Sequence, residues 1–225
     1  MKSSLVLVTA SAVTLILFAH WPQIDLATSR LFFDGVAFPL ETAPWNVALR
    51  WILRVTPFLP ALAGLFIVAG GKWVAPVVLG LGRRDWAAIT LTFILGPGLL
   101  VNRILKSYWG RARPRNVTEF GGDKLFTPPH VWTDQCAANC SFVSGEVSAV
   151  TALSVALIML LAANKDRLGQ GRYRTGLALA ILLPFLSAFQ RISAGGHFLS
   201  DSLLAMLFTL FVAYWVQRFV GSKGR

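Results

Sequence analysis

The chain has 225 residues, of which 55% are hydrophobic and 14% are charged, and its mean hydropathy is +0.62. This composition excludes a soluble domain of that size and identifies an integral membrane protein. The formal net charge of +11 could indicate binding to nucleic acid, but that would require a basic face on a soluble domain, which the composition does not provide. Anionic lipid head groups are therefore the expected partner.

The N-terminal part of the chain begins with an apolar run at 5–20 that follows Lys2. A basic residue ahead of an apolar run is typical of a secretory signal, but no clear cleavage site precedes Trp21, so the run is predicted to remain as an uncleaved anchor. The stretch 23–45 mixes charges with aromatic residues and is predicted to be a loop lying on the membrane surface.

Five further apolar runs are predicted to span the membrane. The second span, 51–69, contains two prolines, which a bundle tolerates where neighbours satisfy the freed carbonyls. Residues 73–82 are too short to cross alone. The third span, 87–105, has a predicted kink or close-packing point at Gly96-Pro97-Gly98. The last three spans are predicted at 147–163, 176–189 and 203–219. The chain shows no internal repeat and no domain boundary, so a single all-α domain, a six-helix membrane bundle over 1–225, is predicted.

The distribution of basic residues predicts which side of the membrane each loop faces. When the spans alternate from a cytoplasmic N-terminus, the cytoplasmic side receives eleven of the 21 Lys and Arg residues: Lys2, Lys72, Arg83, Arg84, Lys165, Arg167, Arg172, Arg174, Arg218, Lys223 and Arg225. The other ten include five cations of the candidate site, so the positive-inside rule favours this orientation. The polar loop 106–140 and His197 are then predicted to face the extracytoplasmic side.

The two cysteines, Cys136 and Cys140, both lie in the loop 106–140. An oxidising compartment would let them form a disulfide, and the alternative is a pair of free thiols. A metal site is not expected, because His130 adds only a third soft ligand and no fourth stands at zinc-like spacing.

Three clusters of polar residues stand at the ends of spans that are predicted to reach the same face. The first cluster, just past the third span, contains Lys106, Arg111, Arg113 and Arg115. A guanidinium can grip two phosphate oxygens while an ammonium acts as a point charge, so this cluster predicts a phosphate-sized site. The alternative is a basic patch that binds lipid surfaces generally.

The second cluster, Ser144-Gly145-Glu146, opens the fourth span. Backbone N–H groups at the start of a helix can bind an anion. The alternatives are structural, because Ser144 would serve as an N-cap and Glu146 would complement the helix dipole.

The third cluster contains Arg191, His197 and Asp201. Ionisable groups beside a bilayer core are rare unless they are used. If the last helix begins near His197, Asp201 lies on the same face and can orient the ring, which is the pairing that a nucleophilic histidine needs. Each cluster by itself could have a purely structural role. Because all three are predicted to lie at the same membrane face, a single functional site is the simpler explanation.

The pattern Lys106-x6-Arg113-Pro114, Ser144-Gly145 and Arg191-x5-His197-x3-Asp201 resembles the three-part signature of the type 2 phosphatidic acid phosphatase (PAP2) family. The resemblance implies a six-helix bundle with a site on the extracytoplasmic side that needs no metal or other cofactor. His197 would attack phosphorus to form a phosphohistidine, and Asp201 would hold its ring. The groups implied to bind phosphate oxygens are Lys106, Arg113, Arg191, Ser144 and the Gly145 backbone. Arg111 and Arg115 are further candidates for binding substrate.

The chain departs from the family pattern at two positions. Glu146 stands where the family usually has a histidine that protonates the departing alcohol, and Val143 stands where it usually has a proline. Glu146 could act as the acid only if its surroundings kept it protonated, and neighbouring arginines would oppose this. A structural or substrate-orienting role for Glu146 is the alternative.

Longer stretches, at 96–102, 109–114, 120–124, 136–142 and 195–201, resemble the bacterial lipid A 4'-phosphatases within this family. That resemblance implies an inner-membrane phosphoric monoester hydrolase that acts on lipid A at the periplasmic leaflet. Phosphatidylglycerol phosphate, phosphatidic acid and undecaprenyl pyrophosphate are alternative substrates within the family. The alternative from another class is a non-catalytic bundle that binds or transports anionic lipids, although such transporters tend to show internal repeats.

Overall fold

A computed structural model of the chain describes residues 2–221 and contains six helical segments long and apolar enough to cross a membrane. They are Ser3–His20, Pro44–Ala69, Arg83–Tyr108, Gly145–Ala163, Lys165–Ser193 and Leu199–Phe219. The prediction of an all-α bundle with six spans is therefore confirmed. Lys223 and Arg225, two of the cations behind the predicted orientation, lie outside the described residues.

The first half of the chain contains α1 (Lys2–His20), α2 (Gln23–Arg30), η1 (Pro39–Glu41), α3 (Pro44–Val55), α4 (Phe58–Ala69) and η2 (Gly71–Trp73). A short antiparallel hairpin follows, in which β1 (Val77–Val78) pairs with β2 (Leu81–Gly82). The remaining elements are α5 (Arg83–Phe93), η3 (Ile94–Leu105), α6 (Lys106–Tyr108), η4 (Pro114–Asn116), η5 (Thr118–Phe120), α7 (Gly145–Ala163), α8 (Lys165–Ser193) and α9 (Leu199–Phe219).

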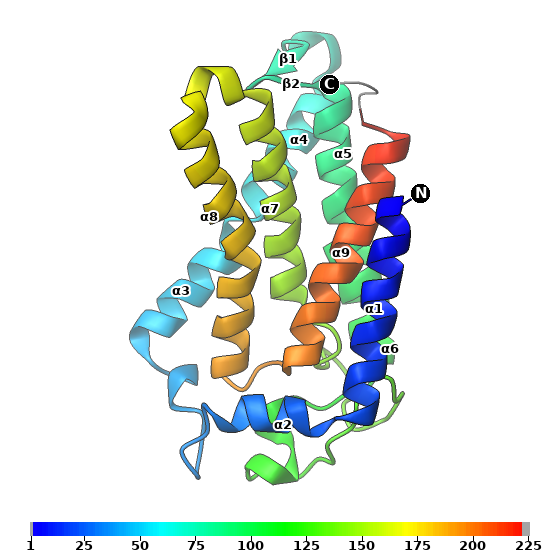
Figure 1. The fold of residues 1–225 in the computed structure, drawn as a ribbon, viewed down its shortest axis with the longest axis vertical. Helices are drawn as coiled ribbons and strands as arrows, with labels where there is room; N and C mark the ends of the chain where they lie inside the picture. The colour runs from blue at the N-terminus through cyan, green and yellow to red at the C-terminus, as the bar shows by residue number, and fades with distance from the viewer. Residues whose placement is uncertain (1, 222–225) are drawn as a thin grey trace.

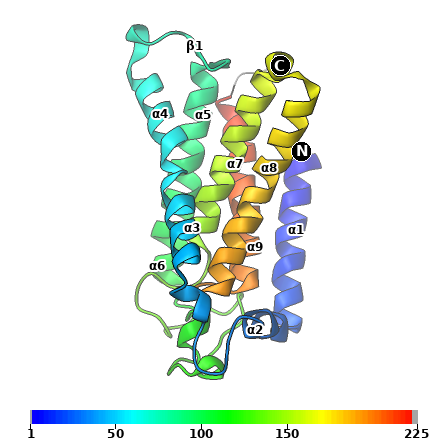
Figure 2. The ribbon, with the colours of Figure 1, turned by 90° about the vertical axis from the view of Figure 1, so that its left-hand side faces the viewer.

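The bundle is elongated, with the hairpin β1–β2 at one end and α2 lying across the other (Figure 1). The loops between α6 and α7 gather at the same end as α2. A quarter turn shows the same arrangement, with both ends of the described chain lying toward the hairpin end (Figure 2). The three clusters predicted from the sequence therefore meet at the end of the bundle that carries α2.

The stretch 23–45 is not the continuous loop that the sequence predicts. Residues 23–30 form the helix α2, and its two fully buried side chains, Asp25 and Ser29, stand four positions apart on one face. Because residues four apart share a helical face, α2 turns a polar face into the bundle while Leu31 beyond it remains exposed. The prediction was wrong for this segment because its burial depends on a polar partner from a distant part of the chain.

The third span changes its helical pitch at the predicted Gly96-Pro97-Gly98 point. Residues 94–105 form a π-helical segment, η3, in which Pro97 cannot donate a backbone hydrogen bond. The Asn102 side chain donates to the Pro97 carbonyl oxygen at 2.7 Å and so satisfies one acceptor within the membrane. Gly96 lies against Thr209 and Val212 of α9, which makes it a close-packing point.

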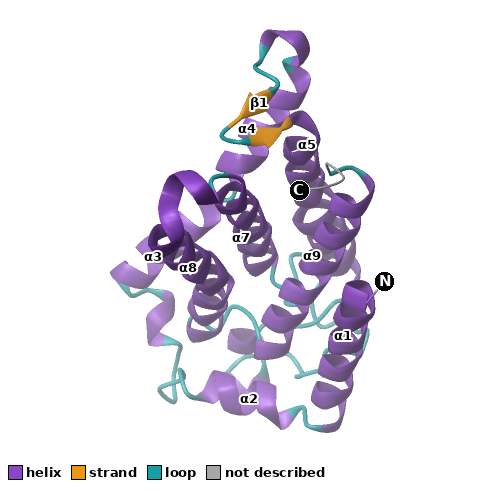
Figure 3. Ribbon diagram, turned by 45° about the horizontal axis from the view of Figure 1, so that its top comes forward, coloured by secondary structure: helices purple, strands orange, loops and turns teal. Residues whose placement is uncertain are grey.

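The helix α7 is central in the bundle and packs against α8, α9 and η3 (Figure 3). Next to the end of the bundle that carries α2, these elements and the loop before α7 enclose an apolar core: Val101, Phe142, Val143, Val147, Ala188, Ile192, Leu204, Ala205 and Met206. Ser148 of α7 and Thr209 of α9 share a hydrogen bond of 2.7 Å, an interhelical contact typical of membrane bundles. The core thus supports the ends of the helices that carry the predicted catalytic groups.

Candidate active site

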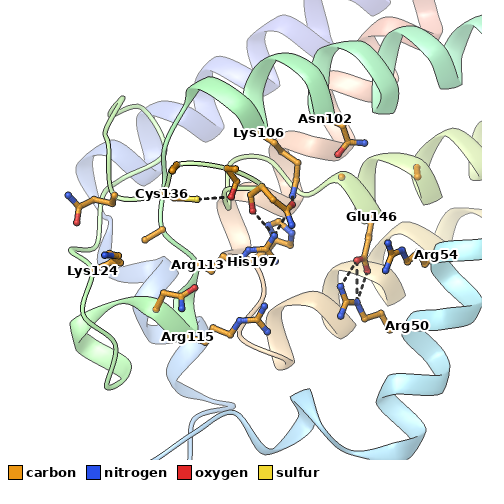
Figure 4. Close-up of a pocket in the computed structure, with 18 of the residues that line it drawn as sticks. Arg50, Arg54, Asn102, Lys106, Arg113, Arg115, Lys124, Cys136, Glu146 and His197 are labelled. Carbon is orange, nitrogen blue, oxygen red and sulfur yellow. Dashed lines mark hydrogen bonds and ion pairs between the residues drawn. The ribbon is translucent and has the colours of Figure 1, made fainter.

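A cavity of about 950 Å³ lies at the end of the bundle where the loops between α6 and α7 gather (Figure 4). Its lining includes an imidazole and six basic side chains: His197, Arg50, Arg54, Lys106, Arg113, Arg115 and Lys124. Two acidic side chains also line it, Asp134 and Glu146. The excess of positive charge makes an anion the expected ligand.

His197 lies between α8 and α9 and is only 2% exposed. Its ring Nδ1 lies 2.8 Å from the carbonyl oxygen of Ser141, which can only accept, so Nδ1 carries the proton. Burial first, and then the positive charge of three neighbours, lower the pKa of His197 well below its usual value. Those neighbours are Lys106, Arg191 and Arg113. The ring is therefore neutral at pH 7, with its lone pair on Nε2, as a nucleophile requires.

Asp201 is fully buried in the first turn of α9, close to the imidazole. Its Oδ2 is 3.9 Å from Nδ1 of His197, too long for a hydrogen bond, and accepts instead from the Ser141 hydroxyl at 2.5 Å and the Phe198 N–H at 3.0 Å. The two groups lie within ion-pair distance, but the predicted shared helical face does not form, because α9 begins at Leu199, after an extended Phe198. Asp201 fixes Ser141, and the Ser141 carbonyl orients the ring.

Lys106 and Arg113 point into the cavity and share one acceptor. Nζ of Lys106 and Nη2 of Arg113 each lie 3.1 Å from Oδ1 of Asn139. Nη2 of Arg113 also donates to the Asn139 carbonyl oxygen at 2.7 Å. Figure 4 shows both cations beside His197, so the structure brings together the predicted nucleophile and two of the predicted phosphate-binding groups.

Arg191 lies in the last turn of α8, is 1% exposed, and is not among the residues that line the cavity. Among residues 2–221, no hydrogen-bond partner satisfies its buried Nε and Nη2 atoms. Buried guanidinium N–H groups are rarely left unpaired, so this group is suited to receive an anion. Gly196 makes the arrangement sterically allowed, because a Cβ atom there would overlap the Arg191 guanidinium.

Glu146 lines the cavity in the first turn of α7 and is held by arginines from two other helices. Arg50 of α3 donates from Nη2 to Oε1 at 2.9 Å and from Nε to both carboxylate oxygens at 3.2 Å. Nε of Arg191 lies 3.6 Å from Oε2. Two flanking guanidinium groups favour a carboxylate, so the geometry fits an orienting role for Glu146 better than the predicted role of a proton donor.

Ser144 and Gly145 open α7, and the structure separates their roles. The fully buried Ser144 hydroxyl accepts from the Val147 N–H at 3.4 Å. Ser144 thus caps the helix, which was the structural alternative, and its own O–H can still donate, so the predicted phosphate contact stays a prediction. Gly145 does line the cavity, beside Asn102 of η3. Its backbone begins a 19-residue helix and remains a candidate for binding an anion.

Arg111 does not reach the cavity, which corrects the prediction that it binds substrate. It is fully buried and donates to four oxygen atoms: Asp25 Oδ2 at 2.8 Å, Asp201 Oδ1 at 2.6 Å, Ser200 Oγ at 2.8 Å and the Thr127 carbonyl at 2.7 Å. Two buried carboxylates already use its charge. Arg111 is therefore a structural cation that links α2 to α9.

The loop side of the cavity carries Arg115, which lines the cavity and forms an ion pair with Glu41 of η1. Cys136, which also lines the cavity, forms a disulfide with the fully buried Cys140. Within the described residues, no group of three or more His, Cys, Asp or Glu side chains is placed to hold a metal ion.

Several residues around the site were not found from the sequence. Arg50 and Arg54 stand four apart at the start of the second predicted span, and this spacing could have indicated two cations on one helical face. Asp25 has no comparable signal, because its partner Arg111 is 86 residues away. Asn139 is a single neutral residue in a polar loop, and its role is visible only through the two cations that it contacts.

Comparisons with known proteins bear on the same segments. Residues 87–225 match the family model of the PAP2 superfamily. A lipid A 4'-phosphatase of Francisella tularensis subsp. novicida (strain U112) is 33% identical over 203 residues, which cover 89% of this chain and 87% of that protein. A lipid A 4'-phosphatase of Rhizobium leguminosarum is 31% identical over 212 residues, which cover 88% of each chain.

A solved structure shares the architecture. The crystal structure of a transmembrane PAP2-type phosphatidylglycerolphosphate phosphatase from Bacillus subtilis has a TM-score of 0.65 and 20% sequence identity, with coverage of 97% of this chain and 96% of that one. At this identity the similarity shows a common fold.

Proposed function

The chain belongs to the PAP2 superfamily and is a membrane lipid phosphatase, a phosphoric monoester hydrolase, and from this premise we propose that it removes the 4'-phosphate of lipid A through a phosphohistidine. The observation that carries the proposal is the His197 ring, with its proton on Nδ1 and its lone pair on Nε2, in a cavity lined by cations. A neutral imidazole among positive groups is suited to attack an anionic phosphorus centre.

The proposed first step is an attack of Nε2 of His197 on phosphorus. The bond from phosphorus to the sugar oxygen breaks, which leaves a phosphohistidine and a sugar alkoxide. Positive charge from Lys106, Arg113 and Arg191 stabilises the equatorial oxygens as negative charge spreads over them. The ring gains positive charge in this step, and the Ser141 carbonyl, 2.8 Å from Nδ1, stabilises it.

The proposed second step restores the ring. The alkoxide takes a proton from a water molecule, and the resulting hydroxide attacks phosphorus opposite Nε2. Inorganic phosphate leaves and His197 is neutral again. Glu146 acts in this scheme by holding Arg50 and Arg191, because its oxygens already accept from the first and lie close to the second.

Lipid A is the proposed substrate for two reasons. Both curated relatives compared above are lipid A 4'-phosphatases. The cavity of about 950 Å³ is near the upper end of the roughly 300–1,000 Å³ typical of ligand pockets, so it has room for a sugar beside the phosphate. Phe58 and Ala149, from the membrane-spanning helices α4 and α7, also line the cavity and would face the acyl chains.

The proposal extends to the bacterial inner membrane, with the cavity facing the periplasm. When the five cations of the candidate site are set aside, the remaining Lys and Arg residues are more numerous on the other side of the bundle, which supports this orientation. The disulfide between Cys136 and Cys140 also supports an oxidising compartment for the loop that carries it.

The test incubates purified protein with lipid A, phosphatidylglycerol phosphate, phosphatidic acid and undecaprenyl pyrophosphate and measures the phosphate released. We expect release from lipid A to be fastest and to be lost in His197→Ala. Faster turnover of another lipid would replace the proposed substrate. Folded protein that releases phosphate from none of them, or that keeps its function in His197→Ala, would instead support a non-catalytic lipid-binding bundle.

A further inference from the structure

The cavity wall opposite α7 includes a loop of five residues closed by the disulfide between Cys136 and Cys140. Asn139 stands inside this loop with a left-handed backbone conformation, φ 52°, which asparagine adopts more readily than most residues. A short covalently closed loop has few accessible conformations. The disulfide therefore limits where the Asn139 side chain can lie.

Asn139 joins two cations that would otherwise repel each other. Lys106 is 6% exposed, and its Nζ shares Oδ1 of Asn139 with Nη2 of Arg113, at 3.1 Å from each. The Asn139 carbonyl adds a second acceptor for Arg113 at 2.7 Å. Like charges at close range disfavour each other, most strongly where water is excluded, so the shared acceptor keeps the two cations side by side.

The loop is attached to the same backbone segment that carries these cations. The Cys140 N–H donates to the Lys106 carbonyl oxygen at 3.3 Å, and the Ser141 N–H donates to the Arg111 carbonyl oxygen at 2.8 Å. The Ser141 carbonyl oxygen in turn holds the His197 ring. The position of the disulfide loop is thus coupled to two phosphate-binding groups and to the nucleophile.

We propose that Asn139, held by the Cys136–Cys140 disulfide, is a positioning residue that keeps Lys106 and Arg113 in register for two oxygens of the substrate phosphate. This inference rests on the proposed function, because it takes the ligand of both cations to be a phosphate. The residue type fits the role: a neutral amide supplies an acceptor, yet phosphate oxygens can take over the same N–H groups. A carboxylate in its place would remain as a competing anion.

The experiment compares Asn139→Ala and Asn139→Asp with the wild type, and Asn164→Ala serves as a matched control. Asn164 donates to the Leu79 carbonyl oxygen at 2.8 Å and is not among the residues that line the cavity. For each protein we would measure kcat, KM, the binding of inorganic phosphate by calorimetry, and thermal unfolding in detergent.

In Asn139→Ala we expect KM and the phosphate Kd to rise about tenfold, as for the loss of a hydrogen bond to a charged group, while kcat stays within about threefold. In Asn139→Asp we expect phosphate binding to weaken further although unfolding occurs at or above the wild-type temperature, because the new carboxylate pairs with both cations. A purely structural role predicts instead that Asn139→Asp, which keeps both contacts, binds phosphate as the wild type does.

Reduction of the disulfide gives a test that needs no substitution at Asn139. Dithiothreitol converts the disulfide to two thiols while it is itself oxidised to a cyclic disulfide. We expect the reduced wild type to show a raised phosphate Kd, and Cys136→Ser/Cys140→Ser to show the same rise without a response to reductant. Unchanged phosphate binding in both reduced protein and Asn139→Asp would overturn the inference. If no lipid is hydrolysed but these phosphate-binding changes occur, the proposed reaction fails while the positioning role stands.

Discussion

Replacing Arg111 is expected to reduce stability, whereas replacing Arg113, two positions further on, is expected to reduce phosphate release. Arg111→Ala removes a fully buried cation whose guanidinium lies 2.8 Å from Asp25 Oδ2 and 2.6 Å from Asp201 Oδ1. Removing one partner of a buried pair costs about 3–5 kcal/mol, and this substitution leaves two carboxylates without a counter-ion. We therefore expect a loss near the upper end of about 3–5 kcal/mol. Because total stabilities are commonly about 5–15 kcal/mol, a loss of this size amounts to a folding defect.

Arg113→Ala should behave differently. Arg113 is half-buried, lines the cavity, and donates to Asn139 without an acidic partner in the described residues. Its removal leaves no carboxylate stranded and reduces repulsion among cations, so we expect the free energy of unfolding to change by about 1 kcal/mol or less. Phosphate release should fall about 10²-fold or more, because a charge that stabilises the transition state is lost.

Thermal unfolding in detergent and phosphate release, measured on the same preparations, separate the two effects. Arg111→Ala should unfold far below the wild type, and Asp25→Asn in the Arg111→Ala background should recover part of the loss because one stranded charge is removed. If Arg111→Ala unfolds with the wild type, or if Arg113→Ala loses as much stability as Arg111→Ala, the assignment of a structural and a phosphate-binding arginine is refuted.

The Arg111→Ala variant should also show a distinctive dependence of stability on pH. Burial raises the pKa of Asp25, and the Arg111 charge opposes this rise. Without the guanidinium the folded-state pKa rises further above the unfolded value of about 4. The folded state then binds the proton more tightly than the unfolded state, so stability should fall as the pH rises through this interval. A stability that instead increases with pH in the variant would contradict the buried position of Asp25.

Three further predictions concern the catalytic groups. Burial lowers the pKa of His197, so kcat/KM should begin to fall on acidification only at a pH well below the ordinary histidine pKa of about 6.5. A fall that is centred at or above that value would count against a buried nucleophile. Glu146→Gln should lower kcat/KM about tenfold at every pH by loosening Arg50 and Arg191, because the proposed scheme uses no side chain as an acid. A kcat/KM that falls at high pH in the wild type but not in Glu146→Gln would restore Glu146 as the acid. Gly196→Ala should displace the Arg191 guanidinium and reduce phosphate release at least tenfold, while a fully active Gly196→Ala enzyme would remove Arg191 from the phosphate site.

The histidine proposed as the nucleophile illustrates what could be predicted from local pattern. His197 and Asp201 stand out because ionisable residues beside apolar spans are rare, and the structure does bring His197 to a cation-lined cavity. The two side chains do lie within ion-pair distance, but not on one helical face as predicted, because Phe198 is extended and the helix begins only at Leu199. A shift of two residues in the start of a helix is within the usual uncertainty of helix boundaries, yet it changes which group holds the ring.

The sequence by itself determined the membrane class, the six spans and the identity of the cations near His197, because apolar runs and charge spacing are local properties of the chain. Only the tertiary structure decided that Arg113 faces the cavity while Arg111 is buried beneath it. The two side chains leave one backbone segment two positions apart, but the partners of Arg111 lie 86 and 90 residues away, on α2 and α9. Long-range pairing of buried charge, which no local pattern encodes, separates the structural arginine from the one proposed to bind phosphate.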